Sequence, residues 1–129
     1  MAKTKQRKLE DKIWKLCKEI IRHRYGNTCY TCGAQGLVGS NWHTGHMIAK
    51  GALGAYLKYD LRVLRPQCMR CNIHHGGMGA EFIERMRNEE GDEYVDSILS
   101  DRKKLVKAVD HYEKIVKEYE SIREEMYSV

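Results

Sequence analysis

No long hydrophobic segment occurs in this 129-residue sequence, whose mean hydropathy is −0.65. A membrane-spanning helix needs a run of about 18 or more apolar residues, and none is present, so a membrane span is excluded. The N-terminal stretch MAKTKQRKLEDK is basic but lacks the apolar core of a secretory signal peptide. These absences predict a soluble protein that works in the cytoplasm.

Proline, internal repeats and low-complexity segments are also scarce or missing. Pro66 is the only proline, and it predicts extended backbone just before Cys68. No internal repeat or low-complexity segment is visible. A chain of this length most simply forms one domain with a modest core.

Charge is distributed unevenly along the chain. Residues 1–71 contain 14 Lys and Arg against 4 Asp and Glu, a net charge of +10. Residues 72–129 contain 9 against 14, a net charge of −5. A basic front half suits a polyanion such as nucleic acid, although a solvated basic face would have the same composition.

Hydrophobic spacing and turn signals predict a mainly helical chain with a short β region. Residues 1–8 are expected to form a basic flexible tail. The stretch NWHTGHMIAK predicts one or two short strands or a hairpin. Helices are expected over residues 9–25, in a short segment near residue 71, and over residues 80–88, 92–99 and 101–127.

Residues 101–129 carry apolar side chains at the alternating three- and four-residue steps of a heptad seam. Its members are Leu105, Val109, Tyr112, Val116, Tyr119 and Met126. This seam either closes the core of its own domain or pairs with a second copy of the chain. Residues 101–129 are therefore a candidate dimerisation element.

The cysteines form two pairs with metal-ligand spacing. Cys29 and Cys32 make one CxxC knuckle, and Cys68 and Cys71 make a second one 35 residues further on. Four thiolates suit tetrahedral zinc, and cysteines in a reducing compartment are more often ligands than disulfides. No βαβ pattern surrounds either pair, which disfavours a redox CxxC. Cys17 lies on the apolar face of the first helix and is expected in the core.

Asn72, His74 and His75 follow the second knuckle in the sequence CMRCNIHHGG. A side-chain oxygen and an imidazole can together ligate a divalent cation, with water in the open positions. Asn72 could instead cap the short helix. His43 and His46 lie between the knuckles, where a strand would turn them to opposite faces. A histidine facing a divalent cation could take a proton from water and drive attack on a phosphodiester. His46 could equally be a buried histidine with a satisfied hydrogen bond.

In this order, the motifs CYTCG, GHMIAK and PQCMRCN resemble the zinc-containing HNH nucleases, also called ββα-metal or His-Me finger nucleases. Within them, the sequence is most similar to the phage NinG/Rap recombination family. The shared pattern is a basic helix ending in a CxxCG knuckle, a Gly-His strand, a QCxxCN segment and a GDEYVDSIL-like helix. It covers about residues 9–100. Phage endonuclease VII, a branched-DNA resolvase, has a similar order of motifs.

The resemblance implies an α+β fold, with a zinc-stabilised ββα-metal nuclease core at residues 9–100 flanked by an N-terminal helix and C-terminal helices. It implies that His46 is the general base, that Asn72 ligates a catalytic Mg²⁺ or Mn²⁺, and that the four paired cysteines hold structural zinc. The implied activity is endonucleolytic cleavage of branched recombination DNA, such as a Holliday junction or a D-loop. The implied setting is a bacterial host cell, with the protein encoded by a phage or prophage. Symmetric cleavage of a junction needs two active sites, so a homodimer is expected.

Two positions depart from the common HNH pattern. Gly45 stands where many of these nucleases have a metal-binding Asp before the catalytic His, although the NinG-like pattern also has Gly there. His43 and His75 are the candidates for the missing ligand. Val63 stands where an Asn usually braces the loop behind the base, and Asp60 is a candidate replacement.

Several basic residues near these motifs are candidate phosphate contacts. They are Lys50, Lys58, Arg62, Arg65 and Arg70. The same residues could simply solvate a polar loop. Trp14 and Trp42 are expected in the core, although Trp42 could stack on an unpaired base. The departures at Gly45 and Val63 leave a second function open, that of a zinc-finger module that binds branched DNA without cutting it.

Overall fold

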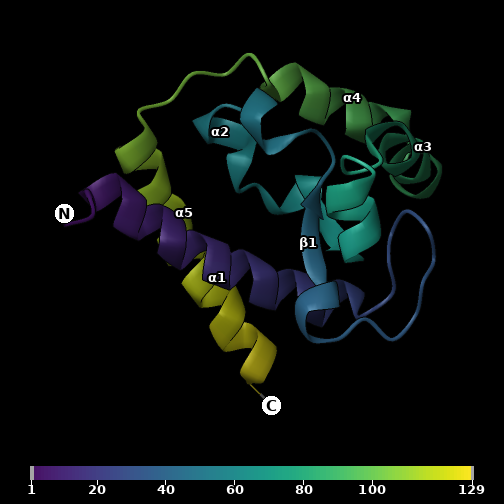
Figure 1. The fold of residues 1–129 in the computed structure, drawn as a ribbon. Coiled ribbons are helices and arrows are strands. Elements are labelled where there is room, and N and C mark those ends of the chain that lie inside the picture. The colour runs from purple at the N-terminus through teal and green to yellow at the C-terminus, as the bar shows by residue number, and fades with distance from the viewer. Residues whose placement is uncertain (1, 129) are drawn as a thin grey trace.

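The computed structural model describes residues 2–128, which form a helix-rich α+β fold with one small sheet (Figure 1). The α-helices are α1 (Lys5–Tyr25), α2 (Ala55–Lys58), α3 (Gly79–Glu90), α4 (Asp92–Asp101) and α5 (Ala108–Tyr127). The strands are β1 (His43–His46) and β2 (Leu64–Gln67). The α+β class expected from the sequence is therefore confirmed. No helix within residues 2–128 is long and apolar enough to cross a bilayer.

Helix α1 begins four residues earlier than the hydrophobic spacing predicts. The Thr4 side chain accepts a hydrogen bond from the Arg7 amide at 3.1 Å, so the N-terminus of the helix is capped. Lys5 to Lys8 are consequently helical, and the prediction of a flexible tail over residues 1–8 is wrong for this part. The helix ends at Gly26, whose φ of 72° favours glycine.

Helix α5 packs against α1 and crosses behind it in the view of Figure 1. Tyr112, Val116 and Tyr119 are buried in the core, so this part of the heptad seam closes the chain's own domain. The seam therefore gives no support to a dimer interface. The predicted helix start at residue 101 is also wrong: residues 102–107 link α4 to α5, and Leu105 is 96% exposed in that linker.

Strands β1 and β2 pair antiparallel, with His43 opposite Gln67 and His46 opposite Leu64. The strand expected around His43 is confirmed, but its partner lies beyond a 17-residue connection that contains α2 rather than in a tight hairpin. After β2 the chain forms one π-helical turn, η4 (Arg70–His74), in the place where a short helix is predicted. The sheet thus brings the residues that follow the second knuckle beside the histidines of β1.

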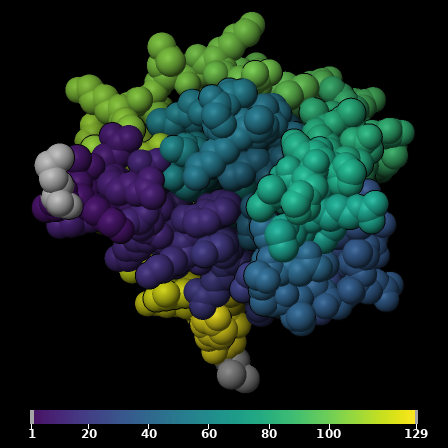
Figure 2. Space-filling model, in the orientation of Figure 1, coloured from purple at the N-terminus to yellow at the C-terminus, as the bar shows by residue number. Residues whose placement is uncertain are grey.

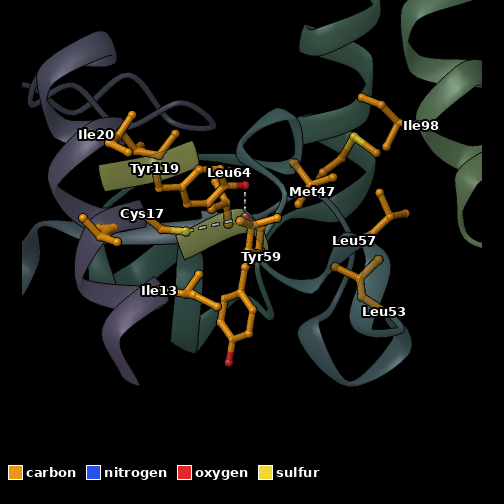
Figure 3. Close-up of a cluster of buried hydrophobic side chains, with 14 of the residues drawn as sticks. Ile13, Cys17, Ile20, Met47, Leu53, Leu57, Tyr59, Leu64, Ile98 and Tyr119 are labelled. Carbon is orange, nitrogen blue, oxygen red and sulfur yellow. Dashed lines mark hydrogen bonds between the residues drawn. The ribbon is translucent and has the colours of Figure 1, made fainter. Parts of the chain in front are cut away.

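The backbone at Tyr59 is a junction between three parts of the core (Figure 3). Its carbonyl accepts hydrogen bonds from the Tyr119 hydroxyl at 2.7 Å and from the Cys17 thiol at 3.5 Å. Cys17 is fully buried on α1, as the sequence predicts. These contacts hold α1, α5 and the segment before β2 together, so the connection between the strands has a fixed position.

Candidate metal centre and histidine pocket

Four cysteine sulfurs gather into a group with the dimensions of a zinc site. Within residues 2–128, the Sγ atoms of Cys29, Cys32, Cys68 and Cys71 all lie within 4.8 Å of one another, and Cys32 Sγ is 3.8 Å from Cys68 Sγ. A zinc tetrahedron with bonds of about 2.3 Å has sulfur–sulfur edges of about 3.8 Å. A disulfide would need about 2.05 Å, and all five cysteines are free. The donor set and its geometry therefore fit zinc.

The knuckle backbone favours the thiolate form of Cys29, whereas burial raises the pKa of Cys71 to about 12. Burial raises the pKa of Cys29, but the backbone amides of Cys68, Cys32 and Thr31 donate to its sulfur and lower the pKa to about 6 overall. Hydrogen bonds to the charged form are the reason for the net decrease. The thiolate is the form of cysteine that binds metal.

The first knuckle is fixed to the sheet next to the second one. The Tyr30 amide donates to the Pro66 carbonyl at 2.8 Å, and Gln67 Nε2 donates to Thr31 Oγ1 at 3.0 Å. Three of the four cysteines are buried, together with Leu37. Strand β2 therefore joins two knuckles that are 35 residues apart in the sequence.

His46 lies beside the metal centre in a hollow of about 670 Å³. Its imidazole stacks on the Trp14 ring, with centroids 5.5 Å apart and planes inclined by 12°. His46 Nε2 is 2.9 Å from the Lys58 carbonyl oxygen. Asn72 and Lys50 also line this hollow. Trp14, expected as a core residue, is half-buried and forms part of the wall.

The contact with Lys58 determines which nitrogen of His46 is free. A carbonyl oxygen can only accept, so Nε2 carries the hydrogen of the neutral imidazole, and Nδ1 is left as an acceptor. Burial lowers the pKa of His46 below its ordinary value, and the positive charges of Lys50 and Lys58 lower it further. The hydrogen bond to the Lys58 carbonyl opposes these effects only in part. At neutral pH the ring is therefore an uncharged base.

Asn72 and His43 are linked by a directed chain of hydrogen bonds. His43 Nε2 lies 2.8 Å from the Ser40 carbonyl oxygen and must donate to it, so His43 Nδ1 accepts from Asn72 Nδ2 at 3.0 Å. This leaves Asn72 Oδ1 free for a cation or a donor. Because both ring nitrogens of His43 are occupied, this residue orients Asn72 instead of offering a ligand atom of its own.

His75, the second candidate for the missing ligand, is exposed on the surface. Its Nε2 accepts from Arg70 Nε at 3.3 Å. It does not line the hollow that contains His46 and Asn72. The structure thus places Asn72 in the hollow of His46 and in hydrogen-bond contact with His43 at the other end of β1, and it leaves His75 outside this group.

Three of the five candidate phosphate contacts are already bound to other groups of the protein. Arg65 is only 1% exposed, donates to the Leu64 carbonyl and packs its guanidinium over Tyr25, so its prediction as a DNA contact is wrong. Arg62 pairs with Asp60 and Asp101, and Lys58 pairs with Glu10 at 2.8 Å. Only Lys50 and Arg70 of the set are exposed.

The brace expected behind His46 comes from backbone rather than from a side chain at position 63 or 60. Val63 is fully buried, and its carbonyl accepts from the Met47 amide at 2.7 Å. The Asp60 side chain caps the turn η3 (Leu61–Val63) and binds Arg62. The Lys58 carbonyl is the group that contacts the His46 ring, a contact no side-chain pattern could have predicted.

Gly45 is required by its neighbour on β2. A Cβ atom at position 45 would lie 1.8 Å from Oε1 of Gln67, which is fully buried. Gln67 Nε2 donates to the Gly77 carbonyl at 2.8 Å and to Thr31, so the side chain joins the first knuckle to the loop after the second. Gln67 therefore occupies the space where an Asp at position 45 would have to lie.

We expect Gly45→Ala to destabilise the fold by about 1–3 kcal/mol, because the added methyl group overpacks against Gln67. Urea unfolding measures the effect. Gly51→Ala is the control, since a Cβ there meets nothing within 4 Å. Equal stability losses for the two variants would show that the contact with Gln67 is unimportant.

The fold and the site define a small helix-rich α+β protein with a four-cysteine metal centre next to a histidine pocket. The family described as "Bacteriophage Lambda NinG protein" matches residues 1–126, and the chain belongs to this NinG family.

Two curated relatives are proteins named ninG, from Escherichia phage 933W and Enterobacteria phage VT2-Sa. Each is 33% identical over 72 residues, which cover 56% of this chain and 34% of the relative. The chain is thus matched to about a third of the length of these relatives. No solved structure matches it.

Proposed function

We propose that this chain is a metal-dependent DNA endonuclease of the HNH, or ββα-metal, type, with His46 as its general base. The observation that carries the proposal is the state of the His46 ring. Its Nε2 is held by the Lys58 carbonyl, its Nδ1 is free, and its pKa is lowered. A positioned neutral imidazole at the wall of a hollow is the arrangement that general-base catalysis requires.

His46 Nδ1 would take a proton from a water molecule as the water oxygen attacks the phosphorus. The bond between phosphorus and the 3′ oxygen would then break and the 3′ oxygen would take a proton from solvent water, which leaves a 5′-phosphate and a 3′-hydroxyl. Trp14 holds the imidazole plane by stacking, so the base does not lose its orientation when it gains the proton. Lys50 lines the same hollow, where its positive charge suits a phosphate.

Asn72 Oδ1 is the side-chain oxygen available to a catalytic Mg²⁺ or Mn²⁺. The four cysteines are the one group of three or more His, Cys, Asp or Glu within residues 2–128 that is placed to bind a metal, and they suit zinc. The second cation would therefore take most of its ligands from water and DNA phosphate, as Mg²⁺ often does. When bound, it supplies positive charge to the phosphate oxygens.

We further propose that the substrate is branched DNA of the kind formed in recombination. Support comes from the resemblance of the CYTCG, GHMIAK and PQCMRCN motifs to phage recombination nucleases, and from the net charge of +10 over residues 1–71, which suits a polyanion. The test compares nicking of a labelled four-way junction with nicking of linear duplex of the same sequence. We expect nicks near the branch point and few in the duplex. Equal cutting of both would overturn branch selectivity while leaving the nuclease intact.

A binding module that recognises branched DNA without cutting it is the second candidate function. No carboxylate lines the His46 hollow, so a catalytic cation would lack its usual protein ligand, and this favours the binding module. An Asp at position 45 could not supply the ligand, because it would displace Gln67. Such a module would bind the junction but would have no use for a free imidazole nitrogen with a lowered pKa.

The nicking rate should increase with pH, with the midpoint of the increase below the ordinary histidine pKa of about 6.5, because the neutral form of His46 is the active one. Lys50→Met removes a positive charge that lowers this pKa, so we expect the acidic limb of the rate–pH profile to shift to higher pH. Lys12→Met, on the far side of α1, is the control. A profile unchanged by Lys50→Met would argue against His46 as the titrating base.

A further inference from the structure

Three adjoining hollows follow helix α1, starting from the hollow of His46. The hollow around His46 shares Trp14, Thr44 and Asn72 with a second hollow of about 280 Å³. The second shares Lys18, Arg22 and Trp42 with a third of about 440 Å³. We call this surface the α1 groove. Figure 2 shows the surface of α1 in purple meeting the blue surface near residue 40 and the teal surface near residue 70.

The charges that line the α1 groove are mostly positive. They are Lys50 in the first hollow, Lys18 and Arg22 in the second, and Lys15 and Glu19 in the third. Glu19, the one acidic residue among them, already accepts a hydrogen bond from the Tyr127 hydroxyl at 2.7 Å and lies 3.9 Å from Arg123. The positive charge of the groove is therefore not balanced from within.

Some cations on other sides of α1 are paired, although Lys8 and Arg24 make no ion pair within residues 2–128. Lys5 lies 2.7 Å from Glu113 and Lys12 lies 3.4 Å from Glu120, both across the contact with α5. Over residues 2–128, Lys15 and Lys18 make no ion pair. Arg22 donates to the Trp42 carbonyl at 2.7 Å and lies 4.5 Å above the Trp42 ring, so its guanidinium is held in place without an acidic partner. The groove side thus carries three cations, Lys15, Lys18 and Arg22, that have no acidic partner within residues 2–128.

The spacing along the groove suits a chain of phosphates. Trp14, Lys18 and Arg22 are successive members of one helix ridge, four residues apart, and span about 12 Å at 1.5 Å per residue. A strand of DNA places one phosphate about every 3.4 Å along its axis, so the ridge covers about three to four nucleotides. Trp14 stacks on His46, so this ridge begins at the candidate catalytic base.

We propose that the α1 groove binds the sugar–phosphate backbone of the DNA strand that is cut and guides it to His46. This inference rests on the proposed function, because it takes DNA as the ligand. It assigns the contacts to Lys15, Lys18 and Arg22, while Lys58, Arg62 and Arg65 serve the fold.

The test measures DNA binding as a function of salt for the full chain with His46→Ala, loaded with zinc and without added Mg²⁺ or Mn²⁺. The probe is a fluorescent four-way junction, followed by anisotropy. Lys15→Met with Lys18→Met removes two cations of the groove. Lys5→Met with Lys12→Met removes two ion-paired cations from other faces of the same helix, so the two double variants have the same net charge. Zinc content and helical circular dichroism show that both remain folded.

We expect the groove variant to bind more weakly and to lose about 0.7–0.9 per phosphate contact from the slope of log K against log salt concentration, or about 1.4–1.8 in all. The control variant should keep the wild-type slope. An equal loss of slope in both variants, or no loss in either, would contradict the proposal that the α1 groove binds DNA. If the parent chain binds no DNA at all, the proposed function fails before the groove is tested. If binding depends on the groove but the wild type cuts no DNA, the result supports the groove as a DNA-binding site and contradicts the proposed nuclease activity.

Discussion

Cys71→Ser is expected to abolish zinc binding and to leave the chain largely unfolded at 37 °C. Cys71 is one of four sulfurs that fit a single tetrahedral ion, and it is only 3% exposed. Zinc binding by small cysteine-rich domains contributes about 10–16 kcal/mol, which equals or exceeds the usual total stability of about 5–15 kcal/mol. Loss of one ligand should therefore remove most of the folding free energy.

Thermal unfolding by circular dichroism and zinc analysis of the purified chain measure this effect. Cys17→Ala is the matched control, because Cys17 is also buried but lies outside the cysteine group. It should keep one zinc per chain and lose only about 0.5–3 kcal/mol. A Cys71→Ser chain with a wild-type melting temperature, or a wild-type chain without zinc, would contradict the metal centre.

His46→Ala is expected to lower the nicking rate by about 10²–10⁴, the usual contribution of a positioned general base. The free Nδ1 of His46 is the proton acceptor in the proposed reaction. His46 is also the one histidine of residues 2–128 that lines this hollow. Single-turnover rates on the junction, with saturating enzyme, separate this loss from any change in binding.

His75→Ala serves as the control for that loss. His75 is exposed, and the one hydrogen bond of its ring within residues 2–128 is with Arg70, so nicking should stay close to wild type. His43→Ala should give an intermediate decrease, because it frees the Asn72 amide to turn. Nicking retained by the His46 variant, with wild-type zinc content, would assign the base to another residue.

The metal centre can be predicted from the sequence because each pair of ligands lies within one short CxxC motif. Each CxxC knuckle presents two sulfurs through its own turn, and no other residue type at that spacing has the same affinity for zinc. The histidine pocket is different. His46 and Asn72 can be named from their motifs, but the roles of Lys58, Trp14 and Gln67 depend on long-range contacts.

Helix boundaries and side-chain burial also depend on long-range contacts that the sequence pattern does not reveal. The heptad pattern includes Leu105 because periodicity does not report whether any element covers that face, and Leu105 is exposed in a linker. Arg65 has the composition of a phosphate contact, yet its guanidinium lies between Tyr25 and Tyr30, which come from the end of α1 and the first knuckle. Such a site is visible only once the chain is folded.

The central claim is that this chain hydrolyses DNA. The most direct measurement incubates the zinc-loaded wild type with a labelled four-way junction, with and without added Mg²⁺ or Mn²⁺, and identifies the ends of any product. The account predicts nicks that need the added cation and carry a 5′-phosphate and a 3′-hydroxyl. Tight binding of the junction with every strand intact in both conditions would contradict it and would favour the binding module.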